Sequence, residues 1–347
     1  MKLTVKKLFL VSLCVLLVLC FWACGSAISN NESSEQADSQ SFSVPESESE
    51  HESDYNSSAV QDLSSEDKEE SSSSEASEDV TVCGDFGYVL TDDVAQLCAY
   101  YGEGTELDIP EELDGHTVAA ITETAFAGNK QLVQINLGNS VINVAEGAFS
   151  GCIALEKVVL GNGVAVVYAN SFDACPALTQ IEVSATNGNY TSAEGILYND
   201  DKSKLIRCPQ GFSAEELSIP QGTAIVGEGA FKNCSGIEAF VLPADCILSA
   251  DSFFHCDNMQ SFRFEGSVPT IPDYCFFGCV LLEEIVLPDG VESLGEYAFF
   301  GCVGLKKLSI PASVISISDT AFDCCTGIEE ADVKGDCATE WYSNYKK

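Results

Sequence analysis

Cysteine and histidine are the residue types in this sequence that could act as a nucleophile, ligate a metal or form a disulfide bridge. The chain of 347 residues has 17 cysteines but only three histidines. Seven of the cysteines recur at intervals of 22 or 23 residues with one interval of 59: Cys152, Cys175, Cys234, Cys256, Cys279, Cys302 and Cys325. Such regularity is typical of a packed column, in which a small and weakly polar side chain fills a buried gap. We therefore predict a structural role for these seven cysteines.

The neighbours of the cysteines argue against a metal centre and against catalysis. Cys275-x-x-x-Cys279 lacks the second Cys pair or the His that a zinc site needs. His255 precedes Cys256, but Cys256 belongs to the repeated column, so a loop His beside a core Cys is the simpler interpretation. Glycine-rich phosphate loops, Gly-x-Ser-x-Gly elbows and His-Glu-x-x-His motifs do not occur in the sequence. The sequence predicts no enzyme, no metal and no cofactor.

Disulfide formation is the remaining chemistry open to the cysteines. Export into an oxidising compartment would favour it. The candidates are the cysteines outside the column, namely Cys83, Cys98, Cys208, Cys246, Cys275, Cys324 and Cys337. A bridge needs a particular Cβ separation and dihedral angle, which a regular repeat does not guarantee. We predict mostly reduced thiols, with disulfides as the alternative.

The first 24 residues have the features of an export signal. Three lysines precede an apolar run over residues 8–24, which is shorter than the ~20 residues of a membrane span. Phe21-Trp22-Ala23-Cys24-Gly25 resembles a bacterial lipobox, with a small residue before the cysteine. The resemblance implies a lipoprotein signal peptide over residues 1–23 and a lipidated Cys24 that holds the protein at the outer face of the cell membrane. An uncleaved anchor or an ordinary secretory signal is the alternative.

Acidic residues are concentrated in the segment that follows. The whole chain has a formal net charge of -38, and residues 25–82 hold 16 acidic residues but a single base, Lys68. This Ser- and Glu-rich segment has few aliphatic residues, so it cannot bury enough apolar surface to offset the entropy of folding. We predict a disordered tether over residues 24–82. The acidic balance also excludes a nucleic-acid partner, because phosphate binding needs clustered Lys and Arg.

The rest of the chain, residues 83–347, contains a repeat of about 23 residues. Each of eight copies is marked by a small residue and then a phenylalanine: Phe126, Phe149, Phe172, Phe231, Phe253, Phe276, Phe299 and Phe322. An alternating apolar stretch follows each copy, such as Ile285 and Leu287, and alternation predicts a half-buried strand. One short strand in each unit of 20–29 residues is the signature of a leucine-rich-repeat solenoid, which buries its apolar face by stacking coils.

The specific form of the repeat resembles the BspA-type leucine-rich repeat. Its pattern is given almost in full by Leu287–Leu305, which reads LPDGVESLGEYAFFGCVGL. The resemblance implies a solenoid with a parallel sheet on one face over residues 83–347, opened by a strand pair that begins near Phe86. We count ten strands, and the helical spacing of Ala338, Trp341 and Tyr345 predicts a short C-terminal helix.

The interval of 59 residues equals 36 plus 23, which indicates one longer coil. Within it, Ile196-Leu197-Tyr198 and Lys204-Leu205-Ile206 flank the turn-forming Asn199-Asp200-Asp201, so we predict a hairpin. The turn lacks the ligand spacing of a calcium loop.

Outward positions of the predicted strands align in two columns, because equivalent residues stack from coil to coil. One column is Asn136, Val159, Glu182, Val241, Arg263, Val286, Ser309 and Asp332, and the other is Gln134, Lys157, Gln180, Ala239, Ser261, Glu284, Lys307 and Glu330. These positions vary between coils while the core positions do not. As the candidate binding face we choose Gln134, Asn136, Lys157, Gln180, Glu182, Arg263, Glu284, Lys307 and Ser309. Unconstrained drift would also produce such variation.

Two classes of function agree with these features. The family resemblance implies a non-enzymatic module on the bacterial cell surface that binds an unknown extracellular protein or glycan through the sheet face, as in adhesion. The alternative is a structural or assembly protein of the bacterial envelope that contacts cell wall or a partner lipoprotein. A repeat scaffold hosts many ligands, so the sequence does not select between them.

Overall fold

A computed structural model of the chain describes residues 80–345. The predicted signal peptide, the lipidation site at Cys24 and nearly all of the predicted tether lie outside the described residues, so these stay predictions. No helix in the described part has the length and apolar character that crossing a membrane requires. The first strand, β1 (Thr81–Cys83), begins two residues before the predicted start of the repeat domain.

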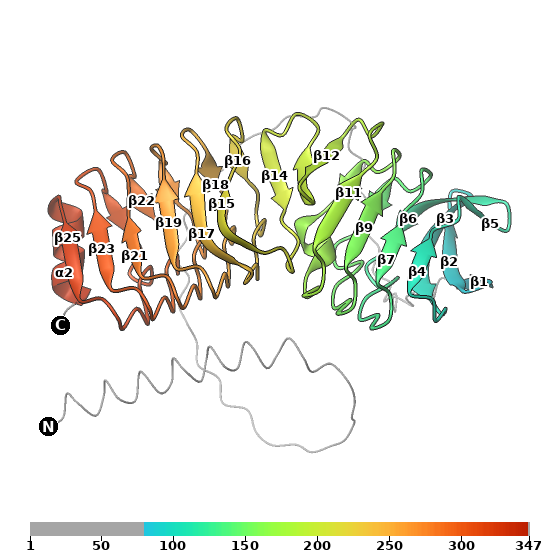
Figure 1. Cartoon of the computed structure of the whole chain (residues 1–347), viewed down its shortest axis with the longest axis horizontal. Helices are drawn as coiled ribbons and strands as arrows, with labels where there is room; N and C mark the ends of the chain where they lie inside the picture. Colours follow the sequence, from blue (N-terminus) through green and yellow to red (C-terminus); the bar gives the residue numbers. More distant parts are fainter. Residues whose placement is uncertain (1–79, 346–347) are drawn as a thin grey trace, which may run out of the picture. The chain divides into compact units, whose positions relative to one another are not determined.

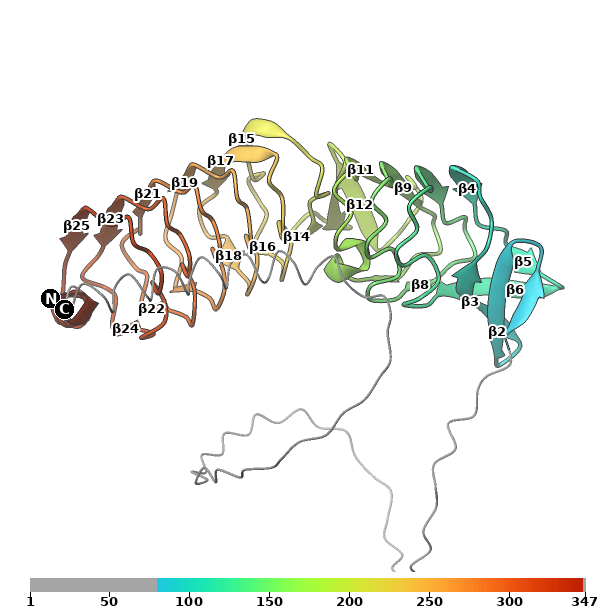
Figure 2. The ribbon, with the colours of Figure 1, turned by 90° about the horizontal axis from the view of Figure 1, so that it is seen from below.

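Ten longer strands, one from each coil, form the predicted parallel array (Figures 1 and 2). They are β4 (Glu106–Asp108), β7 (Gln134–Asn136), β9 (Lys157–Leu160), β11 (Gln180–Val183), β15 (Ala214–Ser218), β17 (Ile237–Leu242), β19 (Ser261–Phe264), β21 (Glu284–Val286), β23 (Lys307–Ile310) and β25 (Glu330–Val333). Each pairs in parallel with its neighbour in the array, in the register that the repeat spacing predicts. The solenoid and its strand count are confirmed.

A second row of strands, most of them only two residues long, lies on the opposite side of the coils (Figure 2). It comprises β6 (His116–Ile121), β8 (Asn143–Val144), β10 (Val166–Val167), β14 (Lys204–Arg207), β16 (Ile225–Val226), β18 (Ile247–Leu248), β20 (Thr270–Ile271), β22 (Ser293–Leu294) and β24 (Ser316–Ile317). Apart from β14, which belongs to the predicted hairpin, sequence analysis did not predict these strands, because most of them have two residues and two are too few for alternation to be visible.

Between the two rows lies the core, whose main feature is a stack of phenylalanine rings. Phe126, Phe149 and Phe172 form one stack, and five later rings from Phe231 to Phe322 form another. Ring centroids of neighbours are 4.8 to 5.8 Å apart with nearly parallel planes. Such aromatic contacts add to the free energy gained by burying the rings. The small residue before each Phe is buried as well, as at Ala148 and Ala298.

The cysteine column follows the rings and has the predicted structural role. Six of its thiols donate to the carbonyl oxygen of a Phe in the preceding coil at 2.9 to 3.3 Å, for example Cys279 Sγ to Phe253 O. Burial raises the pKa of the Cys256 thiol well above its ordinary value. Cys256 is therefore a neutral core donor and not a nucleophile, while its neighbour His255 lies 3.0 Å from Asp257 Oδ1.

Both ends of the stack are capped. At the N-terminal end, β2 (Phe86–Thr91) and β3 (Val94–Tyr100) form the predicted antiparallel pair, joined by β1, and β5 (Glu112–Leu113) pairs with β6. At the other end, helix α2 (Asp336–Tyr345) confirms the predicted closing helix. Trp341 of α2 packs on Phe322 with ring centroids 4.8 Å apart, and Tyr345 Oη donates to the Cys325 carbonyl oxygen. These contacts cover the last coil.

The longer coil divides the solenoid into two parts. Its predicted hairpin is present as β13 (Ile196–Asn199) and β14, preceded by a strand that was not predicted, β12 (Tyr190–Ala193). The amide of Ile181 in β11 donates to Gly195 O at 2.9 Å, so the hairpin occupies the edge where β15 would pair. The ten longer strands consequently form sheets of four and six strands instead of one sheet. The buried apolar residues likewise form two clusters that meet at this coil.

Candidate functional site

The strand register brings the predicted columns together but divides them between the two sheets. In the six-stranded sheet, Glu284 is paired with Ser261 on one side and Lys307 on the other. In the four-stranded sheet, Lys157 is paired with Gln134 and Gln180 in the same way. Gln134, Asn136, Lys157, Gln180 and Glu182 thus share one face, while Arg263, Glu284, Lys307 and Ser309 share another. The residues that we predicted to form one binding face therefore lie on two separate sheets.

Two adjoining hollows lie on the face of the six-stranded sheet. One has a volume of about 280 Å³ and is lined by Arg263 among others, and the second, of about 350 Å³, is lined by Lys307 and Ser309. Glu284 and Val286 line both hollows, and Val286 is 53% exposed. An exposed apolar side chain flanked by charged ones fits the border between the apolar core and the polar rim of a protein interface. We call this surface the β19–β23 face, defined by Arg263, Glu284, Val286, Lys307 and Ser309.

Charges on the two faces differ in how they are paired. Lys157 Nζ lies 2.8 Å from Glu182 Oε1, so these two predicted residues neutralise each other on the four-stranded sheet. Among the described residues, neither Lys307 nor Glu284 forms an ion pair, although they lie side by side on adjacent strands. Their charges are available to a partner.

One column position was predicted wrongly. Val241 in β17 is only 4% exposed, although its place in the alternation put it on the outer face. Glu265 accepts hydrogen bonds from Gln221 in the coil of β15 and from Arg263 in the coil of β19, both at 3.0 Å. In the strand register Val241 lies between Ser218 of β15 and Arg263 of β19.

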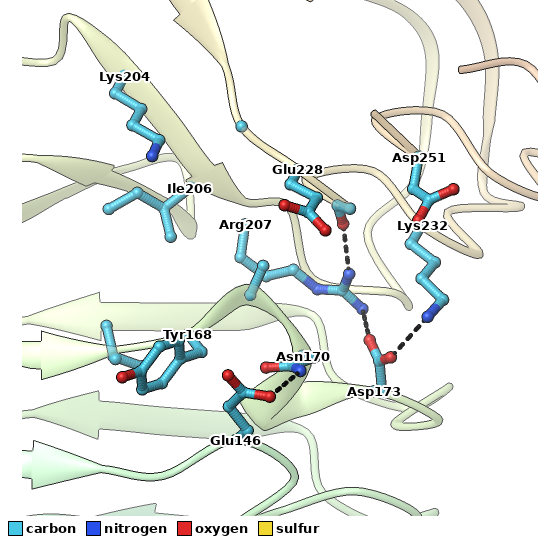
Figure 3. Close-up of a pocket in the computed structure, with 14 residues that line it drawn as sticks. Glu146, Tyr168, Asn170, Asp173, Lys204, Ile206, Arg207, Glu228, Lys232 and Asp251 are labelled. Atoms are coloured by element: carbon cyan, nitrogen blue, oxygen red, sulfur yellow. Dashed lines mark hydrogen bonds and ion pairs between the residues drawn. The ribbon is translucent and has the colours of Figure 1, made fainter. Parts of the chain in front are cut away.

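A separate pocket of about 380 Å³ lies on the other side of the molecule, where the second row of strands is interrupted (Figure 3). Its lining comes from the end of β10, from the 3-10 turn η1 (Ala169–Phe172), from β14 and from the turns after β8, β16 and β18. We call it the junction pocket, because it forms where the longer coil separates β10 from β16. Sequence analysis named none of its residues as functional.

Arg207 is the residue that distinguishes the junction pocket. The interval of 36 residues places Arg207-Cys208 at the two positions where other coils have a small residue and Phe. The backbone confirms this register. Cys208 N donates to Ala230 O at 2.8 Å, and at the equivalent position Phe149 N donates to Ser171 O at 2.9 Å. Arg207 is wholly buried. Alignment of the repeats in the sequence already puts this arginine at a position where the other coils have a small, buried residue. This departure from the repeat could have indicated the site.

The guanidinium of Arg207 belongs to a buried ion cluster (Figure 3). Its Nη1 donates to Gly229 O at 2.7 Å, and its Nη2 lies 3.4 Å from Asp173 Oδ1. Asp173 Oδ2 is also 2.9 Å from Lys232 Nζ. Nε and Nη2 of Arg207 make no hydrogen bond within the described residues. A buried donor without an acceptor is costly, so this cluster is incomplete as it stands.

Carboxylates surround the same pocket. Glu146 accepts a hydrogen bond from Asn170 Nδ2 at 3.0 Å, while Glu228 and Asp251 are without an ion-pair partner among the described residues. Burial raises the pKa of Asp251; the negative charge of Glu228 adds to the rise, whereas Lys232 opposes it. Within the described residues no group of three potential ligands is arranged to hold a metal ion.

A stack of coils that each contribute one longer parallel strand, closed by caps at both ends, defines a leucine-rich-repeat solenoid. This chain belongs to the family of the BspA type leucine rich repeat region, whose model matches six copies over residues 99–212 and 208–329. Proteins built from such repeats are typically binding modules. A search of curated proteins finds no match.

Several solved structures are similar in fold. A leucine rich cell surface protein from Faecalibacterium prausnitzii is 18% identical, with a TM-score of 0.49 over 76% of this chain and 96% of its own. The pneumococcal vaccine antigen PcpA is 16% identical, with a TM-score of 0.47 over 72% of this chain and 86% of its own. A leucine-rich repeat protein from Bacteroides ovatus is 17% identical, with a TM-score of 0.47 over 73% and 71%.

Proposed function

We propose that this protein is a non-enzymatic binding module of the bacterial cell surface, which contacts an extracellular protein through the β19–β23 face. The observation that carries the proposal is the pair of shallow hollows with half-exposed Val286 between the unpaired charges of Glu284 and Lys307. Small-molecule sites are deeper and enclose most of their ligand, whereas a protein partner covers an open surface of this kind.

Attachment to the membrane is the second element of the proposal. The lipobox-like segment around Cys24 supports a lipid anchor, and the acidic segment after it would hold the solenoid away from the membrane. Cys24→Ala is expected to move the protein from the membrane fraction to the soluble fraction and to remove the lipid mass from the intact protein. An unchanged membrane fraction would contradict lipidation of Cys24.

Binding is tested with the full chain, purified from membranes in detergent, against matrix proteins, mucins and cell-wall polymer. The variant Arg263→Glu/Lys307→Glu reverses two charges on the β19–β23 face, and the matched control Lys130→Glu/Lys202→Glu reverses two exposed lysines away from it. We expect saturable binding to a protein that is lost in the first variant and kept in the control. Equal loss in both variants, or binding unaffected by either, would contradict the proposed face.

An envelope role is the alternative proposal, and the same experiment separates the two. Arg263 and Lys307 would then be without consequence, and the full chain would sediment with purified cell wall while it binds none of the soluble proteins. Cross-linking on living cells would then identify the envelope partner.

A further inference from the structure

Five aromatic side chains form a continuous surface on the turns that follow β18, β20 and β22. Phe254, Phe277 and Phe300 stack with ring centroids 4.8 Å apart. Tyr274 and Tyr297 form a second row with centroids 5.2 Å apart, and each contacts the nearest Phe of its own coil, at 5.9 and 5.7 Å. All five side chains are half-buried, so part of each stays accessible to solvent. We call this surface the aromatic platform.

The repeat does not require aromatic residues at these positions. The N-terminal part has Ala127 and Ser150 where the C-terminal part has the three Phe residues of the platform. Its coils nevertheless keep the stacking of Phe126 on Phe149 and the thiol hydrogen bond of Cys152. The needs of the fold therefore do not explain why successive coils carry rings on this surface.

The two tyrosines of the platform are held in a strained backbone conformation. Tyr274 has a φ of 55° and Tyr297 a φ of 54°, in the left-handed region that large side chains rarely adopt. Two other coils have glycine at this position of the repeat, Gly147 and Gly229, for which the conformation costs little. Strain of this kind is concentrated at binding and catalytic sites. It indicates that the two rings have a role beyond folding.

Carboxylates border the platform. Asp273 and Glu296 directly precede the two tyrosines, and Asp319 has the same position in the next coil. All three are exposed, and none of them forms an ion pair among the described residues. Over residues 233–305 the sequence has eleven acidic residues and one base, Arg263, which lies on the β19–β23 face. An apolar surface in such a negative field is complementary to a basic partner.

Lys232 shows how a basic side chain fits this surface. Its Nζ lies 5.8 Å from the centre of the Phe254 ring, at one end of the platform. The same ammonium group pairs with Asp173 Oδ2 at 2.9 Å (Figure 3). It thus uses a ring and a carboxylate at once, as Lys and Arg do when their stems pack on apolar surface. Along the rest of the platform, the described residues supply no further cation to the rings.

We propose that the aromatic platform docks a basic segment of a protein partner. The Lys or Arg stems of this segment pack across the rings, and its charged groups pair with Asp273, Glu296 and Asp319. A planar guanidinium group suits this surface, because it both packs on aromatic rings and binds carboxylates. A second copy of this chain, or its own acidic residues 25–82, would be repelled by the same sign of charge. The platform is separate from the β19–β23 face and does not depend on the function proposed for that face.

Calorimetric titration of the full chain, purified in detergent, with an eight-residue peptide of alternating Arg and Ala tests the proposal. The comparison probes are the same peptide with Glu in place of Arg, and spermine, which has four positive charges but no guanidinium group. We expect saturable binding of the Arg peptide that weakens with salt, no binding of the Glu peptide and about tenfold weaker binding of spermine. Equal binding of spermine would overturn the assignment of a polypeptide. No binding of the Arg peptide would overturn the docking surface.

Variants locate the binding on the platform. Tyr274→Gly/Tyr297→Gly removes two rings without a change of charge, and glycine relaxes the backbone at both positions. Asp273→Asn/Glu296→Gln removes two carboxylates, and the amide oxygen at position 273 can still accept the hydrogen bond that Glu296 N donates at 2.6 Å. Each double variant is expected to weaken binding of the Arg peptide about tenfold. Unchanged binding in the glycine variant would overturn the role of the rings.

Matched controls separate docking on the platform from general attraction to an acidic chain. Glu111→Gln/Glu112→Gln removes two exposed carboxylates near the N-terminal cap, and Tyr101→Ser removes a tyrosine that is 59% exposed. Both controls are expected to bind the Arg peptide as the unmodified protein does, and circular dichroism must show all variants folded. An equal loss of binding in the two carboxylate variants would mean that net charge alone attracts the peptide, which would overturn the proposal.

Discussion

The two parts of the solenoid share one repeat but use its variable positions differently. In the N-terminal part, the column charges Lys157 and Glu182 pair with each other at 2.8 Å. In the C-terminal part, Glu284 and Lys307 make no such pair in the described residues and frame two hollows. The buried Phe and Cys columns recur in both parts, so the repeat fixes the scaffold while the outward residues decide which face can bind.

The cores of the two parts also differ in their aromatic content. In the C-terminal part, Phe240 and Phe262 meet the main ring stack edge-on at about 5 Å. A second stack of half-buried rings, Phe254, Phe277 and Phe300, runs beside it with centroids 4.8 Å apart. The N-terminal part has small or polar residues at the matching positions, such as Ala127 and Ser150. We infer that the C-terminal part is the more stable unit.

The largest expected effect on stability comes from removing one phenylalanine ring of the main stack. Phe276→Ala deletes a fully buried ring between Phe253 and Phe299, which should cost about 3–5 kcal/mol of unfolding free energy. Because the longer coil separates the two cores, hydrogen exchange should accelerate in the C-terminal part and stay unchanged in the N-terminal part. Phe149→Ala is the counterpart and should do the reverse. Uniform acceleration along the whole solenoid in either variant would show that the two parts unfold as one unit.

The second largest effect on unfolding free energy is expected at the ion cluster of Arg207, Asp173 and Lys232, which lies where the two parts meet. Asp173→Ala leaves the buried Arg207 and the nearby Lys232 without their counter-charge, and should cost about 3 kcal/mol. Arg207→Met removes the buried charge itself and should cost less, because an apolar chain of similar length needs no partner. Urea denaturation of both variants measures the difference. The opposite order of stability would mean that Arg207 contributes through contacts other than Asp173.

The smallest effect is a loss of stability in alkali from the buried thiols. Burial raises the pKa of Cys275 to about 12 and that of Cys246 to about 11, both from the ordinary value of 9.0. A raised thiol pKa means that the folded state keeps its proton where the unfolded chain loses it. The stabilising contribution is therefore complete below pH ~9 and is lost as pH rises from 9 towards 12.

For Cys275 alone this loss amounts to roughly 1 kcal/mol at pH 9.5. Unfolding free energy measured from pH 8 to 10 should fall less steeply in Cys275→Ala than in the unmodified protein. A thiol outside the core offers the control: Cys337 is partly exposed, so Cys337→Ala should leave the slope unchanged. Identical slopes in all three proteins would contradict a neutral buried Cys275.

The sequence by itself determined the coils, the ten longer strands, both caps and the structural role of the cysteine column. The coils, the strands and the cysteine column depend on contacts between equivalent residues of adjacent coils, and the spacing of Phe and Cys records those contacts directly. The caps have other signals: the family resemblance implied the opening strand pair, and the helical spacing of Ala338, Trp341 and Tyr345 predicted the closing helix. The hairpin in the longer coil was likewise predictable from its turn residues, since a hairpin is formed by neighbours in the chain.

Only the tertiary structure decided where the candidate sites lie. The division of the sheet follows from Gly195 occupying the edge of β11, a contact that breaks the repeat register. The hydrogen bond between Gln221 and Glu265 joins residues 44 apart in the sequence, and the junction pocket collects turns from several coils around Arg207. Such side-chain arrangements depend on how non-repeating residues pack in space, and no regular spacing records them.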